Sequence, residues 1–244
     1  MVDFPAVAVV DRIDFSNDSV SASPRGPLSA ARYGMGAAGN SNYGWFGGGK
    51  IPGISIVETV DRIDFSNDTG TENIRSPLSA ATYNLTATGN SNYGWFGGGR
   101  TFSPPLETVE RIDFSNDLLA TSPRGPLSLA RYALAATSNS NYGWFGGGYG
   151  GPPLAVVAAV DRIDFSNDSV TASLRGSLNA PSGIFKHAAT GNSNYGWFGG
   201  GQTSGPSVAT VNRIDFSNDL ATASVRGSLS AARYDPAATS NTPT

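Results

Sequence analysis

The sequence predicts an all-β fold in which five similar units of about 50 residues form one closed ring, a single domain spanning residues 1–244. The block Arg-Ile-Asp-Phe-Ser-Asn-Asp recurs at intervals of 49 to 51 residues, starting at Arg12, Arg62, Arg111, Arg162 and Arg213. Such a period is typical of repeat architectures. Frequent Gly, Asn and Pro residues interrupt every helical period. The sequence also starts just before a third strand and ends just after a first strand. This arrangement is expected when both termini contribute strands to the same unit.

Each unit is expected to contain four short strands. In the first complete unit, Tyr33 to Ala38 form the first strand, and residues 39–42 form a hairpin turn, because Gly and Asn tolerate left-handed backbone angles. Tyr43 to Phe46 form the second strand, which is rich in the aromatic residues that strands prefer. Val60 to Phe65 form the third strand, and the residues leading to Arg75 form the fourth.

The second strand carries another repeated block, Tyr-Gly-Trp-Phe-Gly-Gly-Gly, which starts at Tyr43, Tyr93, Tyr142 and Tyr195. Its glycines predict a point where the backbone bends or approaches a neighbour closely. Four copies of this block accompany five copies of the first, so one second strand is missing. Three solutions remain open: Met1 to Ala6 replace it, the closing unit has three strands, or a neighbouring subunit supplies the edge.

Both faces of the third strand carry repeated residues. Alternation places Asp61, Ile63 and Phe65 on one face, with Val60, Arg62 and Asp64 on the other. This pattern indicates sheets stacked between neighbours. We expect complete units at 29–78, 79–127, 128–178 and 179–229, and a closing unit from 230–244 plus 1–28, in which strands from both termini pair and remove the exposed edges.

These motifs resemble the kelch-type β-propeller repeat. Its double glycine after a Tyr and hydrophobic residues is matched by Tyr43 to Gly48, and its third strand by Val60 to Phe65. The resemblance implies a five-bladed propeller. The Trp residues depart from the family pattern, because they lie in the second strand and not the fourth, so the packing between blades must differ. The near-identity of the copies also resembles repetitive structural proteins of bacteriophages.

The repeated charged and aromatic residues are expected to stabilise the frame, which is the set of repeated strands common to all units. Arg12 and Asp14 could bind a carboxylate or sugar, but pairing between blades is favoured, because a buried Arg needs a partner. Asp14, Asn17 and Asp18 could ligate calcium, but capping of a tight turn is favoured. The full set of expected frame residues is Arg12, Asp14, Trp45, Arg62, Asp64, Trp95, Arg111, Asp113, Trp144, Arg162, Asp164, Trp197, Arg213 and Asp215.

Composition excludes several functions. A formal net charge of −3 provides no excess of positive charge with which to bind nucleic acid. The chain has no cysteine and a single histidine, His187, so we expect no metal site, no cofactor and no catalytic residues. No signal peptide or membrane span is apparent, which predicts a soluble protein without membrane insertion.

The connections between second and third strands differ completely among the units, at 50–58, 100–108, 149–159 and 202–210. Variable loops on a rigid scaffold commonly carry recognition, although drift of unconstrained linkers is the alternative. The expected binding residues are Lys50, Ile51, Arg100, Phe102, Tyr149 and Gln202. The leading interpretation is a non-enzymatic propeller, virion-associated or adhesive, that binds protein or carbohydrate or assembles with other subunits. An intracellular kelch-like scaffold is the alternative, and an enzyme is the third.

Overall fold

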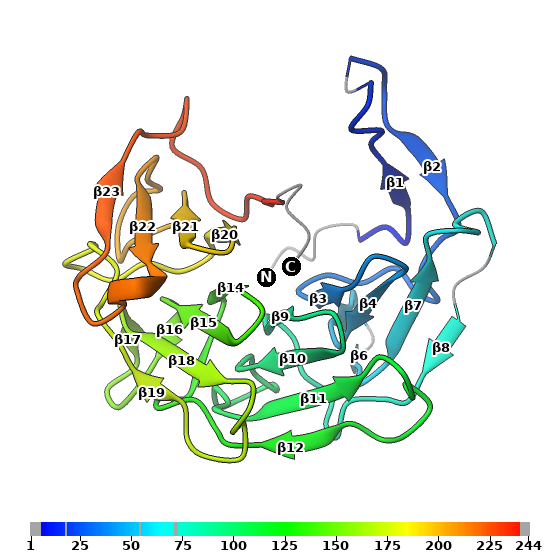
Figure 1. Cartoon of the computed structure of the whole chain (residues 1–244), viewed down its shortest axis with the longest axis horizontal. Helices are drawn as coiled ribbons and strands as arrows, with labels where there is room; N and C mark the ends of the chain where they lie inside the picture. Colours follow the sequence, from blue (N-terminus) through cyan, green and yellow to red (C-terminus); the bar gives the residue numbers. More distant parts are fainter. Residues whose placement is uncertain (1–5, 18, 54, 71–72, 240–244) are drawn as a thin grey trace.

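The computed structural model describes residues 6–17, 19–53, 55–70 and 73–239. The structure is all-β, as the sequence predicts, and within these ranges its one helical element is the short 3-10 helix η1 (Phe216–Asn218). The small antiparallel sheets follow one another along an arc (Figure 1). No helix in the described ranges is long and apolar enough to cross a membrane.

Four sheets share one antiparallel order, in which each strand pairs with the next along the chain except where a loop hairpin intervenes. Sheet I contains β3 (Gly36–Gly39), β4 (Tyr43–Gly47), β7 (Val60–Asp64) and β8 (Asn73–Arg75). Sheet II contains β9 (Thr86–Gly89), β10 (Tyr93–Gly97), β11 (Val109–Asp113) and β12 (Ser122–Arg124). Sheet III contains β14 (Ala135–Ser138), β15 (Tyr142–Gly146), β18 (Val160–Asp164) and β19 (Ser173–Leu174). Sheet IV contains β20 (Ala188–Gly191), β21 (Tyr195–Gly199), β22 (Val211–Asp215) and β23 (Ser224–Arg226).

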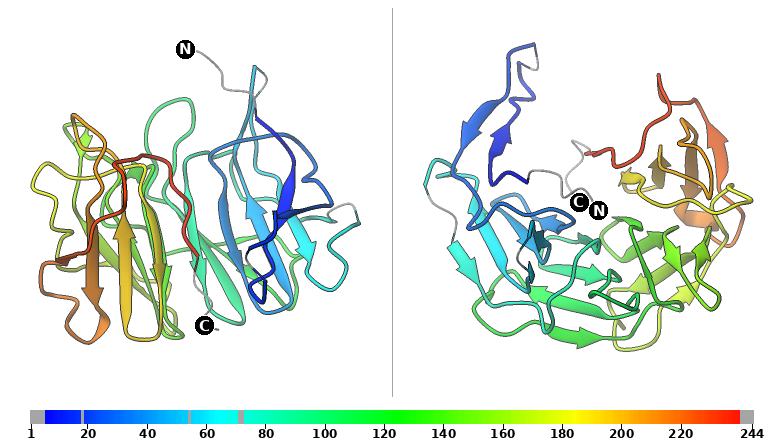
Figure 2. Two further views of the ribbon diagram at one scale, coloured as in Figure 1. Left: turned by 90° about the horizontal axis from the view of Figure 1, so that it is seen from above. Right: turned by 180° about the vertical axis from the view of Figure 1, so that it is seen from behind.

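Three smaller antiparallel sheets accompany these four in the described residues. The terminal pair consists of β1 (Val10–Arg12) and β2 (Ser23–Arg25). In the variable loops, β5 (Lys50–Ile51) pairs with β6 (Ser55–Ile56), and β16 (Tyr149–Gly150) pairs with β17 (Ala155–Val156). The other edge of β16 pairs with β13 (Arg131–Tyr132), which precedes the first strand of sheet III. The first strands of sheets I to IV lie beside one another along the inside of the arc, and Figure 2 shows the sheets standing side by side with loops at both ends.

The first strands are shorter than the sequence predicts, since β3 begins at Gly36 and not at Tyr33. Gly34 adopts φ +70, and the equivalent Asn84, Ala133 and Lys186 adopt φ of 54 to 55. A left-handed residue cannot continue a strand, so the chain bends there. Tyr33 instead forms an isolated bridge with Lys50.

The three glycines that follow the aromatic residues of the second strand allow both the close approach and the backbone bend that the sequence predicts. A Cβ added to Gly47 would lie 2.8 Å from the ring of Phe96 in the next sheet, so only glycine permits this close approach. Gly48 and Gly49 adopt φ of +70 and +110, which glycine tolerates without steric cost. The same arrangement recurs in sheets II and III, where Gly97 meets Phe145 and Gly146 meets Phe198.

Both faces of each inner sheet are packed against neighbours. Trp45 and Val60 of sheet I form one buried cluster with Ile112 and Phe114 of sheet II. The next cluster repeats this arrangement between sheets II and III. Core side chains therefore lie between sheets, and each sheet depends on its neighbours for burial.

The expected pairing of N- and C-terminal strands is not formed by the described residues. The terminal pair has no strand partner in another sheet, and residues 233–238, expected to be a first strand, contain no strand. The segment docks on sheet IV, where Gly201 N donates to Arg233 O at 2.8 Å and Asp235 N donates to Lys186 O at 2.8 Å. These bonds continue the ladder that Ala133 and Lys186 make in earlier units. Of Met1 to Ala6, expected as one source of the missing strand, residues 1–5 lie outside the described part of the chain.

Candidate functional site

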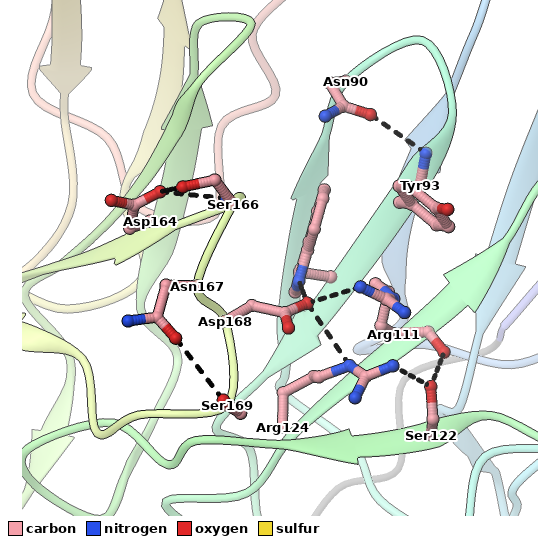
Figure 3. Close-up of polar contacts among 11 residues, drawn as sticks. Asn90, Tyr93, Arg111, Ser122, Arg124, Asp164, Ser166, Asn167, Asp168 and Ser169 are labelled. Carbon is pink, nitrogen blue, oxygen red and sulfur yellow. Dashed lines mark hydrogen bonds and ion pairs between the residues drawn. The ribbon is translucent and has the colours of Figure 1, made fainter.

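Each of three junctions between neighbouring sheets centres on one buried carboxylate. Between sheets I and II, Asp117 Oδ2 accepts hydrogen bonds from Trp45 Nε1 at 2.8 Å and Arg62 Nη1 at 3.1 Å, and Arg75 Nε lies 3.2 Å away. The same donors recur at Asp168, where Figure 3 shows Arg111 and Arg124 converging on the carboxylate. The complete set of the other two junctions is Trp95, Arg111, Arg124 and Asp168, then Trp144, Arg162, Arg175 and Asp219.

Aromatic contacts reinforce these junctions. Phe114 of sheet II stacks on Trp45 of sheet I with centroids 3.9 Å apart, and the corresponding pairs at the next two junctions lie at 3.8 and 3.7 Å. Within sheet I, the Arg62 guanidinium lies 4.3 Å from the centroid of Tyr43, a cation–π contact that recurs in sheets II to IV. The repeated Arg, Trp, Tyr and Phe residues thus hold neighbouring sheets together.

The structure separates the roles of the two Asp residues in each Arg-Ile-Asp-Phe-Ser-Asn-Asp block. The first Asp does not pair between sheets. Asp64 Oδ1 accepts hydrogen bonds from Ser66 N at 2.9 Å and Ser66 Oγ at 2.7 Å, and equivalent bonds occur at Asp14, Asp113, Asp164 and Asp215. The hydroxyl bond and then the backbone bond lower the pKa of Asp64. The last Asp is the partner of the arginines, a role that the sequence pattern did not assign to it.

The turn residues do not assemble a cation site within the described part of the chain, where no group of three His, Cys, Asp or Glu side chains could hold a metal ion. Asp18, one of the residues considered for calcium, lies outside that part. Asn17 Oδ1 accepts a hydrogen bond from Ser19 Oγ at 2.8 Å. The described turn oxygens therefore serve local hydrogen bonds.

A second buried ion pair lies inside sheets I and III and is replaced in sheets II and IV. Arg32 Nη1 lies 2.8 Å from Asp61 Oδ2, and Arg131 Nη2 lies 3.0 Å from Asp161 Oδ2, with all four side chains fully buried. In sheet IV, Ile184 replaces the Arg, and the carboxylate becomes the amide of Asn212. In sheet II, Thr82 replaces the Arg, and the buried Glu110 accepts hydrogen bonds from Ser79 instead. A buried carboxylate needs such a partner, and the change to Asn212 removes this need in sheet IV.

His187 occupies a buried core position. Its ring lies 5.9 Å from that of Phe198, and the equivalent residue in the preceding unit is Leu134. Burial lowers the pKa of His187 from 6.5 to about 4, and the positive charge of Arg131 adds to this effect. The imidazole is therefore neutral at physiological pH.

The first residues of the variable loops share one structural position. Lys50, Arg100, Tyr149 and Gln202 each pair with an aromatic residue that precedes a first strand. Those aromatic residues are Tyr33, Tyr83, Tyr132 and Phe185. The variability of the loops predicted these loop residues but not their aromatic partners, which recur once in each unit at the same position of the repeat.

These pairs form an aromatic band, defined as Tyr33, Tyr83, Arg100, Tyr132, Tyr149 and Phe185. Arg100 lies between two rings, 5.7 Å from the centroid of Tyr83 and 4.6 Å from that of Tyr132. Tyr149 connects Tyr132 and Phe185, at centroid distances of 5.6 and 6.0 Å.

The loops beyond the band differ in exposure. Phe102 is 72% exposed. Ile51 and Gln202 are half-buried at the edges of their hairpins. The sequence-predicted loop residues thus occupy equivalent positions in successive units, and Phe102 is the most exposed large hydrophobic residue of the described chain.

A central cavity of about 290 Å³ lies between the first strands of sheets I to IV. Its lining consists of Ala, Gly, Thr and Ser residues such as Ala38, Thr88, Ser138 and Gly191. No charged side chain lines it. This lining offers hydroxyl and backbone groups but no acid, base or nucleophile pair.

Comparison with known proteins supports the fold alone. No protein-family model matches the sequence, and no curated protein matches it. Among solved structures, one described as the structure of YjhT aligns with a TM-score of 0.76 at 11% sequence identity, covering 97% of this chain and 88% of that chain. At this identity the likeness concerns the arrangement of strands and carries no functional assignment.

Proposed function

We propose that this chain is a five-bladed β-propeller that acts as a binding or assembly module without a catalytic role. Sheets I to IV are four blades, and the terminal pair supplies the outer strands of the fifth. The repeated order of four antiparallel strands and the adjacent first strands support this architecture. The resemblance of the repeat to kelch units supports it independently.

The buried ion pair inside the blades supports the proposal that the ring closes. Arg233 and Asp11 occupy the repeat positions of Arg32 and Asp61, but both are exposed in the described structure. In a closed ring they belong to the same blade, with Arg233 before its first strand and Asp11 in its third. Closure would bury both charges as a pair.

The aromatic band and the loops that flank it are the proposed binding surface. The observation that carries this proposal is that one structural position holds Lys, Arg, Tyr and Gln in four otherwise near-identical units, always beside an aromatic ring. Tyr and Arg are enriched where proteins bind partners. The proposed partner is a protein or a carbohydrate, in a virion-associated or adhesive setting.

The test compares loop variants with a matched control. Phe102→Ala and Tyr149→Ala should weaken binding by about tenfold, as expected for aromatic anchors, while the exposed Phe102 change alters stability by less than ~0.5 kcal/mol. Leu118→Ala, at a residue 68% exposed in the turn beyond the far end of β11, should change neither property.

Binding of the purified chain to a glycan array would identify a carbohydrate ligand. A protein ligand would instead be found by affinity capture from the native source with the purified chain as bait. A variant in which Gly-Ser linkers replace all four variable loops should fold and lose the ligand. If it keeps full binding, the repeated surface is the interface and the loop proposal is wrong.

A further inference from the structure

Strand β1 corresponds to the third strand of a repeat unit, and one of its edges has no strand partner among the described residues. In sheet I the third strand pairs with the second over five residues, from Val60 opposite Gly47 to Asp64 opposite Tyr43. Sheets II to IV repeat this register. Within the described residues, β1 pairs only with β2. The backbone groups on its other edge can therefore pair with an added strand.

Side chains around this edge hold an incomplete copy of the junction. Asp68 is the repeat equivalent of Asp117, and its Oδ2 lies 2.9 Å from Arg12 Nη1 and 3.2 Å from Arg25 Nε. No Trp of the described chain donates to Asp68. The acceptor and both arginines are thus assembled, and the third donor is missing.

The side chains that a Trp and a Tyr would cover at this edge, Phe65 and Arg12, are more exposed than their equivalents at a filled junction. Phe65 is 48% exposed, whereas Phe114, stacked on Trp45, is 8% exposed. The Arg12 side chain is 53% exposed, whereas that of Arg62, lying over Tyr43, is 19% exposed.

Two further features mark the position. Phe46 is half-buried, whereas the equivalent Phe96 is 2% exposed because Gly47 of the preceding sheet packs on its ring. A cavity of about 90 Å³ lies against Asp68 and Ile63. Of their equivalents at the next junction, Asp117 accepts a hydrogen bond from Trp45, and Ile112 belongs to the same buried cluster as Trp45.

We infer that this strand slot, defined by the edge of Val10–Arg12 opposite β2 with Phe46, Phe65 and Asp68, binds an extended peptide strand of the type Tyr-Gly-Trp-Phe-Gly. By the register of sheets I to IV, its Tyr lies opposite Asp14 and beneath Arg12, and its Trp lies opposite Arg12. The Trp stacks on Phe65 and donates Nε1–H to Asp68. The final Gly lies opposite Val10, where only glycine fits against Phe46.

A folded second copy of this chain is not the donor. Its four Tyr-Gly-Trp-Phe-Gly segments are β4, β10, β15 and β21, and each is a central strand paired on both edges. Releasing one would break a sheet. The occupant is therefore a strand of this sequence type that is not already part of a blade.

The inference rests on the terminal pair and sheet I, and it requires neither ring closure nor the aromatic band. Failure of peptide binding would leave the Phe102 experiment intact, and failure of that experiment would leave the slot intact.

The experiment titrates the full chain into a fluorescein-labelled peptide, Asn-Ser-Asn-Tyr-Gly-Trp-Phe-Gly-Gly-Gly, and follows fluorescence anisotropy. Saturable 1:1 binding is expected. Replacing the peptide Trp with Ala should weaken binding at least about tenfold, because a hydrogen bond to a charged group and a ring stack are lost. A scrambled peptide should not bind.

The protein variant Asp68→Asn should bind the intact peptide at least about tenfold more weakly than the wild-type protein does. Both proteins should bind the Trp→Ala peptide with the same affinity, because that peptide has no indole to donate to residue 68. The matched control Asp168→Asn makes the same chemical change at a filled junction and should keep the wild-type affinity, with circular dichroism confirming that both variants fold. Absence of saturable binding, equal binding of the scrambled peptide, or a concentration-dependent dimer that excludes the peptide would each overturn the inference.

Discussion

The junction between sheets II and III and the free face of sheet IV contain the same residue types in different states. At the first, Trp95 is fully buried, donates to Asp168 at 2.8 Å and stacks on Phe165. At the second, Trp197 is half-buried, and within the described residues it has neither a carboxylate acceptor nor a stacked Phe. Identical sequence blocks thus acquire burial and partners only when the next sheet is present.

Replacing the two Trp residues should give the largest contrast. Trp95→Ala should cost about 3–5 kcal/mol of unfolding free energy, as expected for a large buried aromatic side chain. Trp197→Ala should cost about 1–2 kcal/mol, close to an average substitution, because its outer face lacks a neighbour. Urea denaturation measures both. Equal costs would show that Trp197 is buried to the same extent as Trp95, and the comparison would fail.

Acid should weaken the filled junction between sheets III and IV through His187. Its pKa is about 4 in the folded chain and 6.5 unperturbed, so the unfolded chain binds more protons between these values. Stability is therefore complete above pH 6.5 and declines as pH falls towards 4, by roughly 3 kcal/mol in total.

The variant His187→Leu, which places the residue of Leu134 at the equivalent position, should remove this decline and leave the acid loss below pH 4 that carboxylates cause. Denaturation midpoints measured from pH 7 to pH 4 for both proteins provide the test. A decline of equal size in the variant would assign the pH dependence to other groups.

Ring closure should appear as a smaller coupling between the two ends of the chain. In a double-mutant cycle, Asp11→Ala and Arg233→Ala should couple by about 1 kcal/mol or more if they pair as Arg32 and Asp61 do. Two exposed, separate residues should instead give changes within ~0.5 kcal/mol that add. Additive effects would show that sheet IV and the terminal pair remain apart, and the five-bladed ring would be wrong.

The strands and their stacking were accessible from sequence because they depend on local patterns. The aromatic block predicted the second strand, and β4 extends it only to Gly47. Two constrained faces of the third strand indicated sheets packed on both sides, which the buried clusters show. The start of β3 was misplaced, because the left-handed angle occurs at Asn84, Ala133 and Lys186 as well as at Gly34, and residue type alone does not specify it.

The period, the strand order and the types of residue at each junction could be predicted from the amino-acid sequence, because they follow from repetition and alternation along the chain. The packing of the sheets determines which Asp receives the arginines, which loop residues lie on aromatic rings and where a junction is incomplete. Asp64 and Asp68 stand four positions apart in one block, yet one caps its own turn and the other binds two arginines of the preceding sheet. That difference depends on distances between sheets, which repetition along a chain does not encode.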